Sequence, residues 1–305
     1  MATRAPRPRK ALAQYWLQRD DLLQRIVQAA QLQPTDSVLE IGPGTGQLTR
    51  HLLPRVQGLL AVELDAQLVQ FLHKKYGHHE HFWLVQADIL RFNLPAALAH
   101  NPQFPTPNKV VANIPYHITG PLLRYLVGTP SRPWPWPWQR VVLLVQKEVA
   151  QRLTAAPGSK IFGSLSVFLQ YLAHCTWVCD VPADAFYPRP QVDSAVICLT
   201  PRSPDPIALY PRRFEQWVRQ GFSQRRKMLR NTLPLDRSLL LSALEQLGYP
   251  DTVRAEAISA ADWVRLCNAL GEQLADETQI HHPKVQAESH LEILQHLDEP
   301  THLPL

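Results

Sequence analysis

Val38-Leu39-Glu40-Ile41-Gly42-Pro43-Gly44-Thr45-Gly46 is the stretch that decides the fold of this 305-residue chain. The run 38–41 predicts a buried strand, and the glycines after it predict a tight turn that leads into a helix. Glycines in such a turn let the backbone come close to a nucleotide-like ligand. The stretch therefore predicts a strand, a ligand-binding turn and a helix in succession.

The spacing of the glycines narrows the class of ligand. A dinucleotide-binding turn has the pattern G-x-G-x-x-G, but position 47 is Gln, and no G-x-x-x-x-G-K-[ST] phosphate loop is present. The order G-x-G-x-G after an acid-bearing strand resembles class I methyltransferases, which bind S-adenosylmethionine (SAM). Because SAM has no pyrophosphate, a helix N-terminus dedicated to phosphate is not required.

Polar residues stand at the ends of the next predicted strands, 59–62, 82–85 and 110–112. Glu63 lies 21 residues after Gly42, close to the spacing expected for a carboxylate that accepts hydrogen bonds from ribose hydroxyls. Asp88 can accept a hydrogen bond from the cofactor's adenine amine, and Asn113 ends the fourth strand. Asp88 could alternatively cap the following helix, and Glu63 could be a solvated strand end. Their shared position at strand ends favours one ligand site.

Asn113-Ile114-Pro115-Tyr116 follows the fourth strand and predicts the chemistry. The exocyclic amine of adenine is a poor nucleophile, so an enzyme must accept hydrogen bonds from its hydrogens. The Asn113 side-chain oxygen and a backbone carbonyl beside Pro115 are the expected acceptors. Tyr116 is expected to stack on the extracted base. Catalysis then consists mostly of positioning.

The rest of the chain predicts two folded parts and a tail. Strands and helices alternate to about position 170, with strands at 141–145, 177–181 and 195–199, which is the pattern of a doubly wound α/β sheet. The Pro-rich stretch 201–211 marks a boundary, and 214–270 is helical with breaks at Gly221, Pro234 and 248–250. We therefore expect a SAM-binding domain at 1–203, a small C-terminal helical domain at 204–271, and a largely disordered acidic tail at 272–305 with a short helix at 288–297.

The net charge of +5 hides an asymmetry, because residues 271–305 carry −6 and residues 1–270 carry +11. A body this basic favours a polyanionic partner such as RNA. The cations expected to contact phosphates are Arg225, Arg226, Lys227 and Arg230. The alternative surface is the amino-terminal arm with Arg4, Arg7, Arg9 and Lys10, which otherwise could be a transit remnant.

Other features bound the class of protein. No run of 18 apolar residues and no secretory h-region are present. The four cysteines show no C-x-x-C pairing, so we expect reduced thiols in a cytoplasmic protein. We also expect a monomer. No metal-ligand spacing occurs among the histidines, and no metal is expected. The tryptophans of the Pro-Trp repeat at 133–138 are expected to pack locally rather than to stack on RNA.

The chain resembles the small-subunit ribosomal RNA adenine N6-dimethyltransferase family from about Lys10 to Leu270. The resemblance is carried in order by the segments 40–46, Val62-Glu63-Leu64-Asp65, Gln86-Ala87-Asp88, Asn113-Ile114-Pro115-Tyr116, 146–153, 162–167, 186–196 and 222–227. It implies an antiparallel last strand and cofactor contacts from Gly42, Glu63, Asp88 and Asn113.

The resemblance also implies two further contacts. The family motif Gly-Gln-Asn-Phe-Leu reads Ala13-Gln14-Tyr15-Trp16-Leu17 here, so only Gln14 and Leu17 match, and backbone contacts to the cofactor are implied at Tyr15 and Leu17. Phe186 matches an aromatic residue that lies near the target base together with Tyr116.

The leading hypothesis is SAM-dependent dimethylation of two adjacent adenosines in a hairpin near the 3′ end of small-subunit rRNA, with a role in subunit biogenesis. One alternative is a large-subunit rRNA methyltransferase that confers macrolide resistance, which would share the cofactor motifs. Another is a non-catalytic RNA-binding assembly factor or transcription factor. The segment 224–227 and the helical domain favour the small-subunit hypothesis, and the intact cofactor motifs disfavour loss of catalysis.

Overall fold

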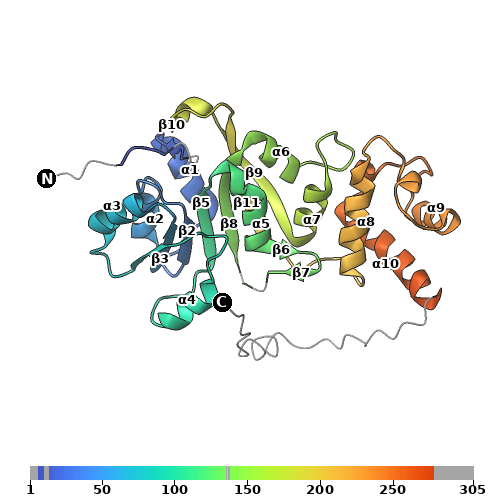
Figure 1. Cartoon of the computed structure of the whole chain (residues 1–305), viewed down its shortest axis with the longest axis horizontal. Helices are drawn as coiled ribbons and strands as arrows, with labels where there is room; N and C mark the ends of the chain where they lie inside the picture. The colour runs from blue at the N-terminus through green and yellow to red at the C-terminus, as the bar shows by residue number, and fades with distance from the viewer. Residues whose placement is uncertain (1–5, 10–13, 135, 137, 278–305) are drawn as a thin grey trace, which may run out of the picture.

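A twisted seven-stranded sheet forms the centre of the molecule in this computed structural model, which describes residues 6–9, 14–134, 136 and 138–277 (Figure 1). The strand order is β4-β3-β2-β5-β8-β11-β9. The first five strands in this order pair in parallel, and β11 pairs antiparallel with both β8 and β9. The strands are β2 (Ser37–Ile41), β3 (Gly58–Glu63), β4 (Phe82–Gln86), β5 (Lys109–Asn113), β8 (Arg140–Gln146), β9 (Ala173–Val181) and β11 (Ser194–Pro201). The doubly wound sheet and its antiparallel strand are thereby confirmed.

Helices cover both faces of the sheet, and a helical region lies at the β9 end (Figure 1). The helices are α1 (Asp20–Ala30), α2 (Thr49–Leu52), α3 (Ala66–Tyr76), α4 (Leu94–His100), α5 (Thr119–Val127), α6 (Lys147–Leu153), α7 (Ser164–Leu172), α8 (Pro211–Ser223), α9 (Arg237–Gln246) and α10 (Ala260–Glu277). Two short ladders join β1 (Trp16–Leu17) to β10 (Phe186–Tyr187) and β6 (Gly128–Thr129) to β7 (Arg132–Pro133).

Alternating side chains of the central strands enter two separate apolar cores. Leu39 and Val110 face one core, whereas Val38 and Val111 face the other, as the two-residue period of a strand requires. The core that contains Val38 is completed by α1, α2 and α3. The core that contains Leu39 continues through α5 and α7 into α8, α9 and α10, so the helical region shares a core with one face of the sheet.

Two glycines inside helices correct the sequence-based boundaries. Gly221 lies within α8, so the predicted helix break there is wrong, and a Cβ at this position would meet the Trp263 ring at 2.8 Å. Gly271 lies within α10, which continues to Glu277, and a Cβ at this position would meet the Tyr210 ring at 2.3 Å. Each glycine therefore makes room for an aromatic ring between packed elements, and the breaks at 234 and 248–250 are confirmed. The acidic tail beyond 277, with its predicted helix at 288–297, lies outside the described residues.

The Pro-Trp repeat packs against its own chain. Trp138 is buried, the Trp136 indole N–H donates to the Pro107 carbonyl at 2.8 Å, and the Trp134 ring contacts Tyr125 with ring centroids 5.3 Å apart. Local packing of these three tryptophans is therefore confirmed. Pro135 and Pro137 lie outside the described residues.

No helix in the described part of the chain is long and apolar enough to cross a membrane. The four cysteines are free thiols, and three of them, Cys179, Cys198 and Cys267, are buried. Burial raises the pKa of the Cys175 thiol to about 12. The cysteines therefore behave as small packing residues.

Candidate active site

The glycine-rich turn between β2 and α2 forms one wall of a cavity at the carboxyl ends of β2, β3 and β5. Gly42, Gly44 and Gly46 have φ angles of +65°, +60° and +77°, a region that glycine adopts without steric cost. Space is also limited, because a Cβ on Gly44 would lie 3.1 Å from the Trp16 ring. Both the backbone conformation and the close approach of Trp16 therefore require glycine at position 44.

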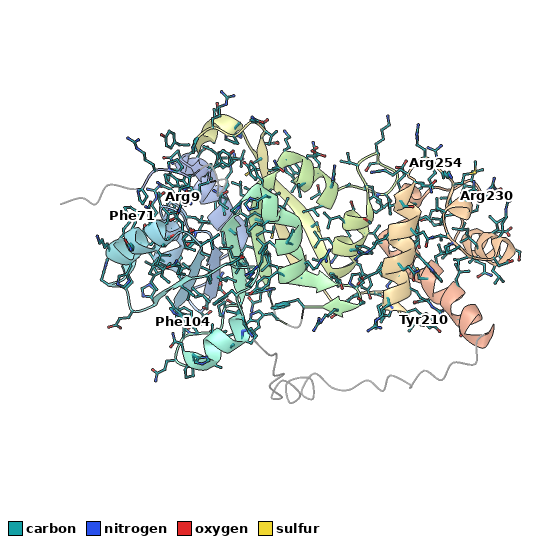
Figure 2. All side chains as sticks on the ribbon, in the orientation of Figure 1. Arg9, Phe71, Phe104, Tyr210, Arg230 and Arg254 are labelled. Atoms are coloured by element: carbon teal, nitrogen blue, oxygen red, sulfur yellow. The ribbon has the colours of Figure 1, made fainter. Side chains whose placement is uncertain are left out.

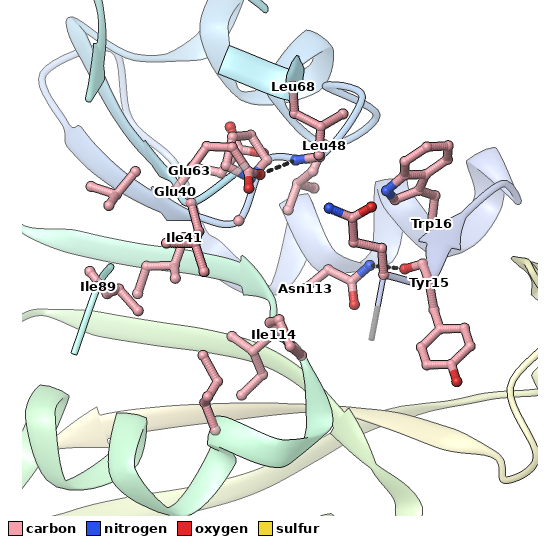
Figure 3. A pocket seen from close by; sticks show the side chains of 18 of the residues that line it. Tyr15, Trp16, Glu40, Ile41, Leu48, Glu63, Leu68, Ile89, Asn113 and Ile114 are labelled. Atoms are coloured by element: carbon pink, nitrogen blue, oxygen red, sulfur yellow. Dashed lines mark hydrogen bonds between the residues drawn. The ribbon is translucent and has the colours of Figure 1, made fainter. Parts of the chain in front are cut away.

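Glu63 ends β3 beneath this turn and is 7% exposed. One of its carboxylate oxygens accepts a hydrogen bond from Gly44 N at 3.1 Å (Figure 3), and the other accepts one from Asp65 N at 2.9 Å. Each carboxylate oxygen has a second lone pair, so the side chain can still accept two hydrogen bonds from a ligand. Burial raises the pKa of Glu63 above its usual value.

Glu40 is a second buried carboxylate of the site, and it is not among the residues predicted from the sequence motifs. It is 1% exposed, and its Oε2 accepts a hydrogen bond from the Thr49 hydroxyl at 2.8 Å. Its Oε1 has no hydrogen-bond partner among the described residues. A charged residue inside the otherwise apolar run 38–41 was the signal that could have identified it, because a lone buried carboxylate is costly.

Burial raises the pKa of Glu40 to about 8, and the nearby Glu63 carboxylate adds to the rise. Because an unperturbed Glu has a pKa near 4.5, the stabilising contribution of neutral Glu40 is complete below pH 4.5 and is lost as the pH rises toward 8. We expect the ligand-free wild type to lose more thermal stability between pH 5 and pH 8 than Glu40→Gln, which stays neutral. For each 1 kcal/mol of unfolding free energy that the wild type loses and the variant keeps, the Tm values of the two proteins should diverge by roughly 2–4 °C. Parallel Tm curves for the two proteins in thermal unfolding across this pH range would contradict the assignment.

Asn113 ends β5 with its amide held in one orientation. Its Nδ2 donates to the Tyr15 carbonyl at 3.1 Å (Figure 3). Since a carbonyl only accepts hydrogen bonds, the Nδ2 group must face Tyr15, and the Asn113 Oδ1 is left to accept. The neighbouring Ile114 carbonyl accepts no hydrogen bond from the described residues, whereas the Pro115 carbonyl accepts one from Ile118 N at 3.2 Å. The site therefore offers two open acceptors, Asn113 Oδ1 and Ile114 O.

Tyr116 lies beside these acceptors and is fixed in place. Its hydroxyl is 2.7 Å from the hydroxyl of Ser194, which is fully buried at the start of β11. Burial raises the pKa of the Tyr116 phenol, so it stays protonated at neutral pH. The Tyr15 ring stacks on Tyr116, with ring centroids 5.6 Å apart and planes 20° apart.

The other residues predicted for the site are Asp88, Leu17 and Phe186. Asp88 lines the cavity, and its Oδ1 caps the following turn by accepting a hydrogen bond from Leu90 N at 3.0 Å. Leu17 also lines the cavity and pairs in register with Phe186 across the β1–β10 ladder. Phe186 is 5% exposed, packs in the core with α1, and is not among the cavity-lining residues described. A contact between Phe186 and the target base therefore stays a prediction.

The four cations predicted to contact RNA lie in the helical region and fall into two kinds. Arg225 donates to the carbonyls of Lys160 and Phe162 at 2.6 and 2.7 Å and pairs with Glu256 at 3.0 Å. Arg230, at the far end of the helical region, pairs with Asp251 (Figure 2). Arg226 and Lys227 are exposed and form no ion pair with the described residues. Of the four predicted cations, Arg226 and Lys227 are therefore the ones available to contact a phosphate.

The sequence of the chain matches known proteins over nearly the whole described region. A family model described as ribosomal RNA adenine dimethylase matches residues 6–272. The chain belongs to this family. A relative from Trichormus variabilis, named ribosomal RNA small subunit methyltransferase A, is 53% identical over 267 residues, which cover 87% of this chain and 98% of the relative. A protein of the same name from Synechococcus elongatus is 48% identical over 269 residues, which cover 87% and 95%.

Two solved structures share the fold of this family member. A dimethyladenosine transferase from Plasmodium falciparum superposes with a TM-score of 0.70 at 24% identity, covering 84% of this chain and 98% of the other. The 23S rRNA methyltransferase ErmE superposes with a TM-score of 0.66 at 27% identity, covering 84% and 99%. The class I methyltransferase fold predicted from the glycine-rich turn is therefore confirmed.

Proposed function

We propose that this protein transfers methyl groups from SAM to N6 of two adjacent adenosines in a hairpin near the 3′ end of small-subunit rRNA. The observation that carries the proposal is the pair of open acceptors, Asn113 Oδ1 and Ile114 O, beside the carboxylate-lined cavity of the glycine turn. The names of the relatives, ribosomal RNA small subunit methyltransferase A, support the choice of subunit.

The charge of the cavity fits SAM. Its lining includes the carboxylates of Glu63 and Asp88, beside Glu40 whose raised pKa favours the neutral form, and, among the described residues, neither Lys nor Arg. Such a cavity suits a ligand that carries a sulfonium and an ammonium group, and it disfavours a pyrophosphate. Glu63 would hold the ribose hydroxyls, Asp88 the adenine amine, and Tyr15 and Leu17 would contribute backbone contacts. The Oε1 of Glu40, which has no hydrogen-bond partner among the described residues, adds a buried polar atom that a ligand could satisfy.

The chemistry follows from positioning. SAM, when bound, supplies an activated methyl group on its sulfonium. Asn113 Oδ1 and Ile114 O would each accept a hydrogen bond from the target amine, which draws its lone pair out of conjugation with the ring. Pro115 fixes the backbone that presents the Ile114 carbonyl, and Tyr116 would stack on the base. No strong general base is needed, because the methyl group on the sulfonium is already activated, and the protonated phenol of Tyr116 is not called on to act as one.

The direct test uses the purified protein, SAM and an RNA hairpin with the 3′-end sequence of small-subunit rRNA. Mass spectrometry of the product nucleosides should detect N6,N6-dimethyladenosine. The same nucleosides should be missing from rRNA of a strain that lacks the gene. A product that stops at monomethyladenosine, or methylation of large-subunit rRNA alone, would contradict the proposal.

The large-subunit alternative is disfavoured. The relatives named for the small subunit are 53% and 48% identical to this chain, whereas the 23S rRNA methyltransferase ErmE is 27% identical. A non-catalytic role is disfavoured because Glu63, Asp88 and Asn113 meet at one cavity. We further propose that the protein acts as a cytoplasmic monomer without a metal. In the described residues, no group of three His, Cys, Asp or Glu side chains could hold a metal ion.

We propose that residues 1–203 bind SAM and that the helical region 204–271 contributes to RNA binding. The double variant Arg226→Gln/Lys227→Gln is expected to lower the magnitude of the slope of log affinity against log salt, by roughly 0.7–0.9 for each cation. Arg225→Gln is the matched variant. It removes a contact to three acceptors of the chain, so we expect it to lower the melting temperature.

RNA affinity measured over a range of salt concentrations, beside thermal stability, separates the two effects. An unchanged slope in the double variant would move the RNA surface to the amino-terminal arm. Of that arm, Arg7 and Arg9 are described, and Arg9 lies 3.6 Å from Asp65. Arg4 and Lys10 lie outside the described residues.

A further inference from the structure

Tyr15 is the residue of this site that departs most from the family motif, in which Asn occupies its position. The structure gives it two contacts, one through its backbone and one through its ring. Its carbonyl accepts the hydrogen bond from Asn113 Nδ2, and its ring stacks on Tyr116. One residue therefore touches both the proposed amine acceptor and the proposed base-stacking ring.

The two rings of the stack are held differently. Tyr116 is anchored through its hydroxyl to Ser194, a buried residue of the central sheet. Tyr15 directly precedes β1, a strand of two residues, and its ring is partly exposed. Figure 3 shows its ring pointing away from that of Trp16, which lies against the glycine turn. Tyr116 is thus the fixed ring of the pair, and Tyr15 is the ring that can shift.

The spacing of the rings is that of a closed slot. A base inserted between two rings needs contacts of about 3.5 Å on each side, or ~7 Å between the rings. The two rings stack on each other at present, with centroids 5.6 Å apart. Because this distance includes the sideways offset of the rings, an opening by about one base thickness, ~3.5 Å, would admit one flat base. The slot would open beside Asn113 Oδ1 and Ile114 O, where the target amine must sit.

We propose that Tyr15 is a second stacking wall, so that the flipped-out target adenine is held between Tyr15 and Tyr116. In the free protein the Tyr15 ring closes the slot by stacking on Tyr116 itself. This inference rests on the proposed function, because it assumes an adenine substrate. It assigns to the side chain at position 15 a contact with the substrate, whereas the family resemblance implies only a backbone contact with the cofactor.

The test compares wild type with Tyr15→Phe, Tyr15→Ala and the family-like Tyr15→Asn. In single-turnover methylation of the RNA hairpin at saturating SAM, Tyr15→Ala and Tyr15→Asn should be slower by roughly 5- to 150-fold, the range that loss of one aromatic stack produces. Tyr15→Phe should keep the wild-type rate. SAM affinity should be unchanged in all three, because the contact proposed between position 15 and the cofactor is made by the backbone, as is the hydrogen bond with Asn113.

A second readout reports stacking directly. The hairpin carries 2-aminopurine in place of one target adenosine, and stacking on an aromatic ring quenches its fluorescence. Binding to wild type and Tyr15→Phe should quench the probe more than binding to the Ala and Asn variants. Equal quenching in all four proteins, an Ala variant as fast as wild type, or a Phe variant as slow as Ala would overturn the inference. If the wild type fails to methylate the unmodified hairpin, the proposed function fails instead, and the fluorescence comparison still decides whether the slot exists.

Discussion

Asn113→Ala is expected to reduce single-turnover methyl transfer by on the order of 10²–10³-fold, the usual cost of removing one preorganised hydrogen-bonding group from an active site. The structure gives the reason. The Tyr15 carbonyl fixes the Asn113 amide so that Oδ1 can accept a hydrogen bond from the target amine. With Ala, the amine would keep one acceptor, the Ile114 carbonyl. RNA affinity should change little, since the cations proposed to contact phosphates lie outside the cavity.

Single-turnover kinetics with prebound SAM and RNA measure this effect apart from binding. Asn93→Ala is a matched control, because Asn93 caps α4 by accepting a hydrogen bond from Ala96 N at 3.1 Å and lies outside the cavity. It should lower stability slightly and leave the rate unchanged. A near wild-type rate in Asn113→Ala would refute the proposed role of the amide.

Glu63→Ala is expected to weaken SAM binding by about 1–3 kcal/mol, or roughly 5- to 150-fold in Kd. The variant removes the proposed acceptor for the ribose hydroxyls. It also releases Gly44 N and Asp65 N, the two backbone groups that the carboxylate now holds. The glycine turn should therefore loosen as well, and part of the loss in affinity would come from that loosening.

Calorimetric titration of SAM, with thermal unfolding of the same samples, measures both consequences. Glu80→Ala is the matched control, because Glu80 is exposed at the turn before β4 and is not a lining residue of the cavity. An unchanged Kd in Glu63→Ala, or tighter binding of NAD than of SAM by the wild type, would show that the cavity has been assigned to the wrong ligand.

The strand ends were predictable from the sequence because parallel strands bring their carboxyl ends to one edge of the sheet. Gly42, Glu63, Asp88 and Asn113 stand at four such ends, and all four line the cavity. The family resemblance added Tyr15 and Leu17, which also line it.

Other features depend on contacts between distant segments and leave no local pattern. The Tyr15–Tyr116 stack joins the chain's start to the end of β5. Arg225 bonds to backbone carbonyls, which every residue carries, so its sequence neighbours could not reveal an inward role. Gly221 and Gly271 look like helix ends until the aromatic rings packed against them are known.

The shared core limits how far the catalytic part can be used as a module. Phe214, Trp217 and Trp263 are almost completely buried in the same apolar cluster as β2 and α7. A chain cut at residue 203 would leave the facing apolar surface of α7 open to water, and large apolar patches of this kind promote aggregation. Grafting this methyltransferase onto another RNA-binding module therefore requires carrying α8, α9 and α10 along as part of the enzyme's body.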